Sequence, residues 1–326
     1  MHIPDGFLDA KVAVATGVVA AGGLGVALRH ARLHFPPRRI PLLGLAAAFV
    51  FAVQMLNFPV VGGTSAHVVG SVLVAVLLGP SAAVIVLASV LIVQCLVMGD
   101  GGITALGANI FNMGMIGAVL GWGVYYTVSR MVKGLFGRVL AASFAAWLSM
   151  VLAATICAVE LAASHPNLFP WPKIFYLMAG VHVIVGLGEG IATALVLVAL
   201  ARTRPELLEP AATAAPSRPY RTVAAYGTII ALGLAFFIAP LLELPNMPDS
   251  LDKMKDELGI RGGPSWWKPI ENYTMPGIPE HLHWLAVSLA GVVGTIVVFG
   301  LAWLLARSLV PRKVEENLDA SKNISV

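Results

Sequence analysis

Residues 81–98 read SAAVIVLASVLIVQCLVM, an apolar run without a charged side chain. A transmembrane helix needs about 20 mostly apolar residues, so this run is nearly long enough to cross a bilayer. The whole chain is similarly apolar: 58% of the 326 residues are apolar, 12% are charged and the mean hydropathy is +0.85. Soluble proteins carry about 25% charged residues. The sequence therefore predicts an all-α polytopic membrane protein.

Working outward from this run, the apolar content of roughly 189 residues suffices for about nine transmembrane helices. The third and fourth are separated only by Gly79-Pro80, so they are either two spans or one broken element. Apolar runs and their interruptions predict helices near residues 10–28, 40–56, 66–78, 81–98, 105–128, 138–163, 175–201, 222–242 and 284–306.

A segment rich in Pro, Ala and charge, RTRPELLEPAATAAPSRPYR at 202–221, is typical of a linker. It divides a seven-helix part, residues 1–205, from a two-helix part, residues 222–326, with the linker itself over 206–221. The two-helix part contains a loop at 243–283. Within this loop, the spacing of Leu251, Met254 and Leu258 before Gly259 predicts a short amphipathic helix.

Basic residues predict the orientation in the membrane. If the N-terminus is extracytoplasmic, 15 of the 21 Lys and Arg residues fall in cytoplasmic loops or in the C-terminal tail. Cytoplasmic loops of membrane proteins are enriched in Lys and Arg. We therefore expect the N-terminus outside and the C-terminus in the cytoplasm.

The first residues, MHIPDGFLDA, lack the basic start and the small-residue cleavage site of a signal peptide, so Met1 and His2 are expected to persist. The Met1 α-amine, the His2 backbone nitrogen and the His2 imidazole can then chelate one cation in nearly flat rings. Flat nitrogen coordination suits Ni²⁺ or Cu²⁺, whereas Zn²⁺ prefers a tetrahedron. The alternative is that His2 is an exposed terminal residue.

His67 is the best candidate for a fourth ligand, because it lies in a Gly-rich break predicted to be at the same membrane face as the N-terminus. A histidine at a membrane-buried or interfacial position is costly without a partner, which favours a functional role. The alternative is that Asn57 or Ser65 satisfies His67 by hydrogen bonding.

Three further polar residues lie in QCLVMGDGGITALGANIFNMG, where glycines surround Asp100, and Asn109 and Asn112 share one helical face. Such a segment can pack its backbone tightly under a ligand, although an ordinary turn explains it equally well. His182 and Glu189 share a face of another helix, and Glu160 lies in an apolar run. These three side chains form a proton path or pair with each other and with Asn or Gln; we favour pairing.

Several functions are excluded by missing motifs. No Lys is followed by Ser or Thr, so no Walker A site for ATP exists, and neither HExxH nor GxSxG occurs. No soluble domain or aromatic-basic patch suited to nucleic acid is present. Cys95 and Cys157 lie in separate apolar runs, which favours core positions over a disulfide.

Four motifs, MHIPDGFL, NFPVVGGTSAH, GDGGITALGANIFNMG and GVHVIVGLGEGIAT, closely resemble the NikM/CbiM nickel and cobalt substrate-binding subunits of energy-coupling factor (ECF) transporters. The resemblance covers about residues 1–201. It implies that the free N-terminus enters the protein and that Met1, His2 and His67 coordinate the metal. The polar residues singled out along the sequence are candidates for supporting positions around these ligands: Asn57, Ser65, Asp100, Asn109, Asn112, His182 and Glu189.

The remainder, with MPDSLDKMKDELGI and NYTMPGI, resembles the NikN/PDGLE-type accessory component, except that Ser250 replaces the usual Gly. The fusion and the Pro4-Asp5 pair look more like the nickel than the cobalt branch, whose members often read MHIMEGFL. The resemblance implies a prokaryotic inner membrane location. It also implies a transmembrane coupling protein (NikQ/CbiQ-like) and an ABC ATPase (NikO/CbiO-like) as partners.

Taken together, the sequence predicts a non-enzymatic substrate-capture subunit of an ECF-type nickel importer. Cobalt uptake by the same architecture remains an alternative, because four nitrogens bind both ions. An ion-coupled secondary transporter that uses His182, Glu189 and Glu160 is a rival from another class. A membrane metallohydrolase is a further rival, although Glu189 is its only candidate base.

Overall fold

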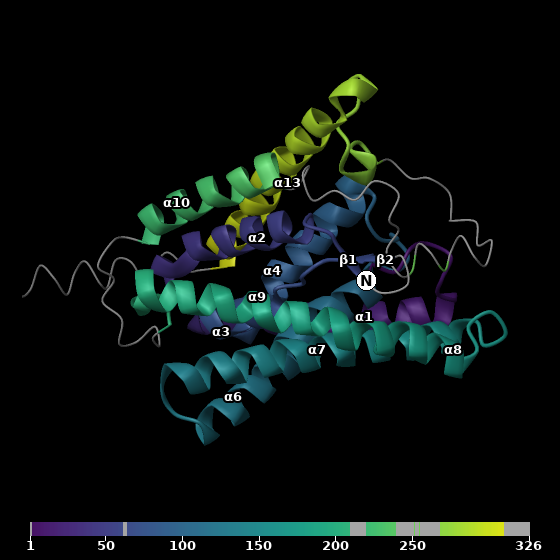
Figure 1. Ribbon diagram of the computed structural model, residues 1–326, viewed down its shortest axis with the longest axis horizontal. Helices are drawn as coiled ribbons and strands as arrows, with labels where there is room; N and C mark the ends of the chain where they lie inside the picture. Colours follow the sequence, from purple (N-terminus) through teal and green to yellow (C-terminus); the bar gives the residue numbers. More distant parts are fainter. Residues whose placement is uncertain are drawn as a thin grey trace, which may run out of the picture.

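The computed structural model describes residues 2–60, 64–208, 220–238, 251, 254 and 268–309, and nearly all of its regular structure is helical (Figure 1). The predicted all-α class is confirmed. The first half contains α1 (Ala10–His34), η1 (Pro37–Arg39), α2 (Ile40–Gln54), β1 (Phe58–Val60), β2 (Thr64–Ala66), α3 (Ser71–Leu78), α4 (Pro80–Val93), η2 (Gln94–Met98), α5 (Leu106–Asn109), η3 (Ile110–Leu120) and α6 (Gly121–Met131). The second half contains α7 (Gly134–Ser164), α8 (Trp171–Phe175), η4 (Tyr176–Gly180), α9 (Val181–Thr203), η5 (Pro205–Leu207), α10 (Tyr220–Gly233), η6 (Leu234–Ile238), η7 (Glu271–Tyr273), η8 (Glu280–Leu282) and α13 (His283–Leu309).

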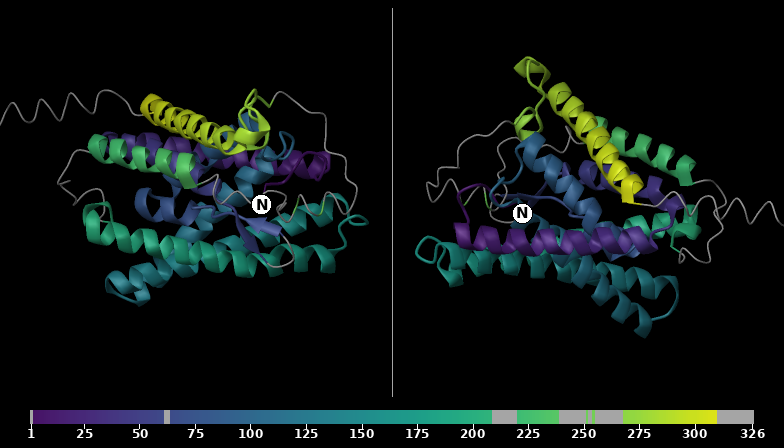
Figure 2. Two further views of the ribbon diagram at one scale, coloured as in Figure 1. Left: turned by 45° about the horizontal axis from the view of Figure 1, so that its top comes forward. Right: turned by 180° about the vertical axis from the view of Figure 1, so that it is seen from behind.

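Five helical segments of the described chain are long and apolar enough to cross a membrane. They are Ala10–His34, Pro80–Met98, Gly134–Ser164, Trp171–Thr203 and Glu280–Ser308. Two shorter apolar helices, Ile40–Gln54 and Thr222–Ile238, accompany them. Three of the long helices, α1, α7 and α9, run along the longest axis of the molecule, whereas α4 and α13 are tilted to it (Figures 1 and 2).

The centre of the bundle is α4, the apolar helix that follows Gly79-Pro80. It packs against α1, α2, α3, α13 and η3, and most of its side chains are buried. A helix that is apolar on all sides is stable only when neighbours surround it. This central position explains why the stretch at 81–98 lacks charge.

The prediction of a helix over residues 66–78 holds only for its second half. Residue 66 is the last of a short antiparallel pair of strands, β1 and β2, and residues 67–70 have no regular structure. Only Ser71–Leu78 is helical, and this α3 is about 12 Å long, less than half of a hydrocarbon core of about 30 Å. Gly79, with φ +91°, ends α3, and α4 begins at Pro80. The chain at this point is therefore a broken element rather than two full spans.

The two helices after the linker lie together on α2, on the side away from α7 (Figures 1 and 2). The last helix, α13, approaches α2 closely at Gly294, because a Cβ built there would stand 2.1 Å from the Phe51 ring. In the predicted amphipathic helix, Leu251 and Met254 are helical and buried, while Leu258 and Gly259 lie outside the described residues.

Candidate metal centre

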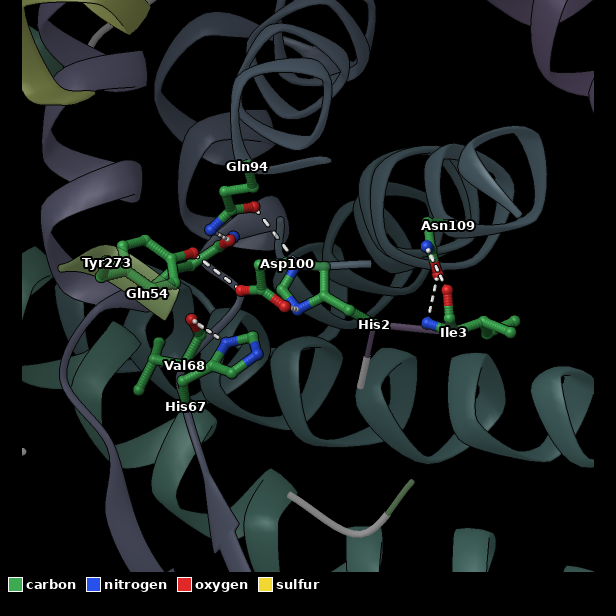
Figure 3. A network of polar contacts seen from close by, with 9 residues as sticks. All are labelled: His2, Ile3, Gln54, His67, Val68, Gln94, Asp100, Asn109 and Tyr273. Carbon is green, nitrogen blue, oxygen red and sulfur yellow. Dashed lines mark hydrogen bonds and ion pairs between the residues drawn. The ribbon is translucent and has the colours of Figure 1, made fainter. Parts of the chain in front are cut away.

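The N-terminal segment runs into the protein. His2 is 5% exposed and Ile3 is fully buried, so the alternative of an exposed terminal histidine is wrong. Asn109 holds Ile3 from both sides: the Ile3 N–H donates to Asn109 Oδ1 at 2.8 Å, and Asn109 Nδ2 donates to the Ile3 carbonyl at 3.2 Å (Figure 3). The Gly102 N–H donates to the same carbonyl at 2.8 Å. Met1 itself lies outside the described residues.

The Gly-rich loop after η2 forms the surface on which this segment lies. A Cβ built on Gly102 would stand 2.4 Å from the Asp5 backbone nitrogen, closer than real Cβ atoms come, so only glycine permits this approach. Asp5 Oδ1 accepts hydrogen bonds from the Thr104 backbone N–H at 2.8 Å and from its hydroxyl at 2.6 Å. The predicted close packing of the loop is therefore present, and it packs against the chain's own first residues.

A chain of two amides determines which nitrogen of His2 carries a proton. Gln54 Nε2 donates to the Val69 carbonyl at 2.9 Å, and Gln94 Nε2 donates to Gln54 Oε1 at 2.9 Å. This direction leaves Gln94 Oε1 as an acceptor, 3.2 Å from His2 Nε2. Because an acceptor requires a donor, we assign a proton to Nε2. At the other ring nitrogen, Nδ1, the acceptor is Asp100 Oδ1 at 3.0 Å. A metal ion on Nδ1 would replace the proton that this second contact requires.

Asp100 links His2 to the C-terminal part of the chain. Its Oδ1 lies 3.0 Å from His2 Nδ1, and its Oδ2 accepts a 2.7 Å hydrogen bond from the Tyr273 hydroxyl (Figure 3). Burial acts to raise the pKa of Asp100, but the positive charge and hydrogen bond of His2 outweigh it and hold this pKa well below its usual range. Burial and the Asp100 charge raise the pKa of Tyr273, so its phenol keeps its proton.

His67 lies against His2, with ring centroids 5.1 Å apart and an interplanar angle of 25°. Burial, together with the positive charges of the N-terminus and His2, lowers the pKa of His67 to about 3. The ring is therefore neutral at physiological pH. Its Nδ1 lies 3.3 Å from the Val68 carbonyl, which assigns the proton to Nδ1 and leaves a lone pair on Nε2.

Glu189 fixes the backbone just after His67. Its two carboxylate oxygens accept hydrogen bonds from the Val69 N–H at 2.6 Å and the Gly70 N–H at 2.8 Å. Gly70 has φ +76°, a conformation that favours glycine, and it directly precedes α3. Glu189 on α9 thus stabilises the turn that carries His67.

The remaining residues that the sequence analysis singled out have other partners or positions. His182 and Ser65 line a small cavity with His67, and His182 Nδ1 lies 2.7 Å from the Met178 carbonyl. The pairing that we favoured for His182 and Glu189 is replaced by backbone partners. The expected amide partner is present for Glu160, which accepts a 2.7 Å hydrogen bond from Asn112. Asn57 is half-buried directly before β1.

Three residues of this network were not predicted: Gln54, Gln94 and Tyr273. The two glutamines stand in otherwise apolar runs, and polar side chains inside membrane helices usually mark functional positions. That signal was available and could have identified them. No comparable signal exists for Tyr273, because its contact with Asp100 joins residues 173 positions apart.

Within the described residues, no three His, Cys, Asp or Glu side chains form a metal-binding group. A metal at His2 and His67 would therefore need backbone or terminal nitrogens to complete its coordination. The buried start of the chain brings the His2 backbone nitrogen into this region.

Comparison with known proteins supports a transport role. A family model described as "Cobalt uptake substrate-specific transmembrane region" (CbiM) matches residues 2–207. The chain is 36% identical over 307 residues to the "Putative fused nickel transport protein NikMN" of Archaeoglobus fulgidus, covering 94% of this chain and 98% of that protein. It is 32% identical over 216 residues to the "Cobalt transport protein CbiM" of Geobacter sulfurreducens, covering 64% of this chain and 61% of that protein.

A solved structure, the crystal structure of a truncated transition metal transporter, is similar to this fold. It is 33% identical, with a TM-score of 0.57, and the match covers 62% of this chain and 99% of that one.

Proposed function

The chain belongs to the CbiM family of metal-uptake transmembrane proteins, and on this premise we propose that it is the substrate-capture subunit of an ECF-type importer for nickel. Its Ni²⁺ ligands would be the Met1 α-amine, the His2 backbone nitrogen, His2 Nδ1 and His67 Nε2. The observation that carries this proposal is the burial of His2 against His67 at the end of the chain.

The hydrogen bonds around His2 support this ligand set. Only Nδ1 of the imidazole can close a chelate ring with the preceding backbone nitrogen, and the Gln94–Gln54 chain directs the proton to Nε2. A ligating histidine generally donates its other ring N–H to an oxygen, which fixes the orientation of the ring. Gln94 provides that oxygen for His2, and the Val68 carbonyl provides it for His67.

The proposed ligands and Asp100 would also neutralise the charge of the ion. A buried Ni²⁺ ion carries two positive charges, and uncompensated charge in a protein interior is costly. The deprotonated His2 amide and the Asp100 carboxylate would each supply one negative charge. When Nδ1 binds the ion, Asp100 gives up its contact with Nδ1 and remains beside the site through its hydrogen bond with Tyr273.

Nickel is favoured over cobalt because a deprotonated amide and fused rings impose flat coordination, which suits Ni²⁺. Cobalt uptake by the same architecture is the second candidate, since relatives of this chain carry either nickel or cobalt in their names. Equilibrium competition between Ni²⁺ and Co²⁺ on the purified protein distinguishes them.

Energy for uptake would come from partners: a CbiQ-like coupling protein and a CbiO-like ATPase. The sequence has no Walker A motif. The alternative hypothesis, an ion-coupled secondary transporter, requires mobile carboxylates. Glu189 instead accepts hydrogen bonds from backbone N–H groups, and Glu160 accepts one from Asn112. The chain alone in proteoliposomes should therefore bind nickel without accumulating it, even under a proton gradient.

The decisive experiment is to extend the N-terminus by a few residues. This converts the α-amine into an amide and adds bulk next to the buried His2, so nickel binding should be lost. A chain with the same extension at the C-terminus is the matched control and should bind one Ni²⁺. His2→Ala and His67→Ala should abolish binding, while His281→Ala and His283→Ala should not. If the N-terminally extended chain keeps one nickel at unchanged affinity, the ligands lie elsewhere, and the region of His182 and Glu189 is the next to test.

A further inference from the structure

A cavity lies at the end of α1 opposite to His2. It has a volume of about 810 Å³ and is bounded by the end of α1, the joint between α3 and α4, α6, the start of α7, and η5. Since α1 is 25 residues long, about 37 Å separate its two ends, so this cavity is independent of the metal centre. By the distribution of basic residues, this end is the cytoplasmic one.

Basic side chains from several elements line the cavity. Among the described lining residues there is no Asp or Glu. Ser81, Tyr125 and Ser129 also line the cavity, and the Ser81 hydroxyl lies 3.1 Å from His30 Nδ1. The combination of positive charge and hydroxyl donors favours an anion such as phosphate. The basic residues are His30, His34, Arg39, Lys133 and Arg138.

The rest of the cavity wall is apolar. Leu77, Leu78 and Leu207 line it together with Trp122, whose ring stacks on Tyr126 at 5.1 Å. Trp and Tyr are enriched where a membrane protein meets the lipid headgroups. A ligand that satisfies the whole cavity therefore has an anionic end and a long apolar end.

We propose that this cavity binds an anionic phospholipid, with its phosphate among Arg39, Lys133 and Arg138 and its acyl chains along the leucines. Basic pockets between transmembrane helices at the cytoplasmic side are a known means of holding anionic headgroups. The inference goes beyond metal capture, because it concerns what the opposite end of the molecule binds.

The test uses the full chain in nanodiscs of phosphatidylcholine, with or without phosphatidylglycerol. Lipid retained by the protein is counted by native mass spectrometry, and thermal stability is measured in parallel. Wild type should retain phosphatidylglycerol selectively and be stabilised by it. The double variant Lys133→Gln/Arg138→Gln should lose at least tenfold in retention. Both side chains are exposed, and such substitutions usually change stability little.

The matched control is Arg29→Gln/Arg32→Gln, which removes the same charge from the same end of the molecule, outside the cavity. It should behave as wild type, and all variants should still bind nickel at the other end. Equal retention by the two double variants, or no preference for phosphatidylglycerol, would overturn the proposal. Displacement of the lipid by millimolar inorganic phosphate would assign the site to a free anion. Binding only of an acidic partner segment would assign it to a protein.

Discussion

The Tyr273 hydroxyl donates a 2.7 Å hydrogen bond to Asp100, the carboxylate that contacts His2. Tyr273 belongs to the segment between the last two helices, so the C-terminal part of the chain takes part in the polar network around His2. The Ile270 N–H donates to the Val97 carbonyl at 3.0 Å and holds this segment on the end of η2. The accessory part is therefore in direct contact with the loop that positions the start of the chain.

Replacing Tyr273 with Phe should weaken nickel binding by about tenfold, because loss of a supporting hydrogen bond next to a metal site typically costs 10- to 100-fold in affinity. The ring contact with Phe51 is retained in this variant. Calorimetric titration with Ni²⁺ measures the effect. Tyr226→Phe, on an exposed side chain of α10, is the control and should leave affinity unchanged. Equal affinities for both variants would show that Tyr273 does not support the site.

Replacing Gly102 with Ala should displace the N-terminal segment, since the added Cβ would collide with the backbone at Asp5 and Pro4. We expect at least tenfold weaker nickel binding and faster proteolysis of the first residues. Gly123→Ala, where a Cβ meets no atom within 4 Å, is the control and should be neutral or slightly stabilising. Unchanged binding in Gly102→Ala would contradict the observed approach of the loop.

Replacing Glu189 with Gln should loosen the turn after His67. Gln offers one acceptor oxygen where the carboxylate offers two, so either the Val69 or the Gly70 N–H loses its partner. An unsatisfied buried donor costs about 1–3 kcal/mol of stability. Both the melting temperature and nickel affinity should fall, whereas Glu280→Gln on the exposed surface should change neither. A fall in stability without a change in affinity would limit Glu189 to a structural role.

His67 should make a contribution to the stability of the metal-free protein that is lost as the pH falls from 6.5 to 4.5. The pKa of His67 is lowered from 6.5 to about 3, so in this range the unfolded chain binds a proton that the folded chain does not. Asp100, whose pKa is lowered from 3.8, contributes only below this range. In His67→Gln this contribution is absent, so the melting temperature of the variant relative to that of wild type should rise as the pH falls. The measurement is the melting temperature across this pH range, and identical slopes for both proteins would contradict the low pKa.

The orientation can be tested with single cysteines at Arg218 and Lys255, which lie on opposite sides of the membrane if the N-terminus is extracytoplasmic. The native Cys95 and Cys157 are buried and should react slowly. An impermeant thiol reagent added to intact cells should label position 255 and spare position 218. Equal labelling of the two positions would refute the topology.

The sequence predicted much of the site because its signals were local. A terminal histidine, a histidine in a Gly-rich break and a Gly-rich loop at Asp100 each stand out along the chain, and the structure brings His2, His67 and Asp100 together. The contacts that could not be predicted depend on packing. Glu189 accepts hydrogen bonds from the backbone after His67 because α9 approaches the turn after β2, and no spacing along one helix specifies that contact.

The hairpin was missed for a different physical reason. Its strands are three residues long, and their apolar residues are the kind that also continue a membrane helix, so periodicity does not distinguish the two. The glycines at 62, 63 and 70 were the available sign that the helix could not begin at residue 66.

The hydrogen bonds that Glu189 accepts from Val69 and Gly70 also determine how late in biosynthesis the turn after His67 can form. These contacts join residues about 120 positions apart, so the turn after His67 cannot be held until residue 189 has left the ribosome. At about 5–20 residues per second, roughly 10–40 s separate the appearance of His2 from that moment. His2, among the first residues to be synthesised, is therefore among the last to gain its complete surroundings. On the proposed ligand set, a nascent chain would bind metal only after insertion of α9.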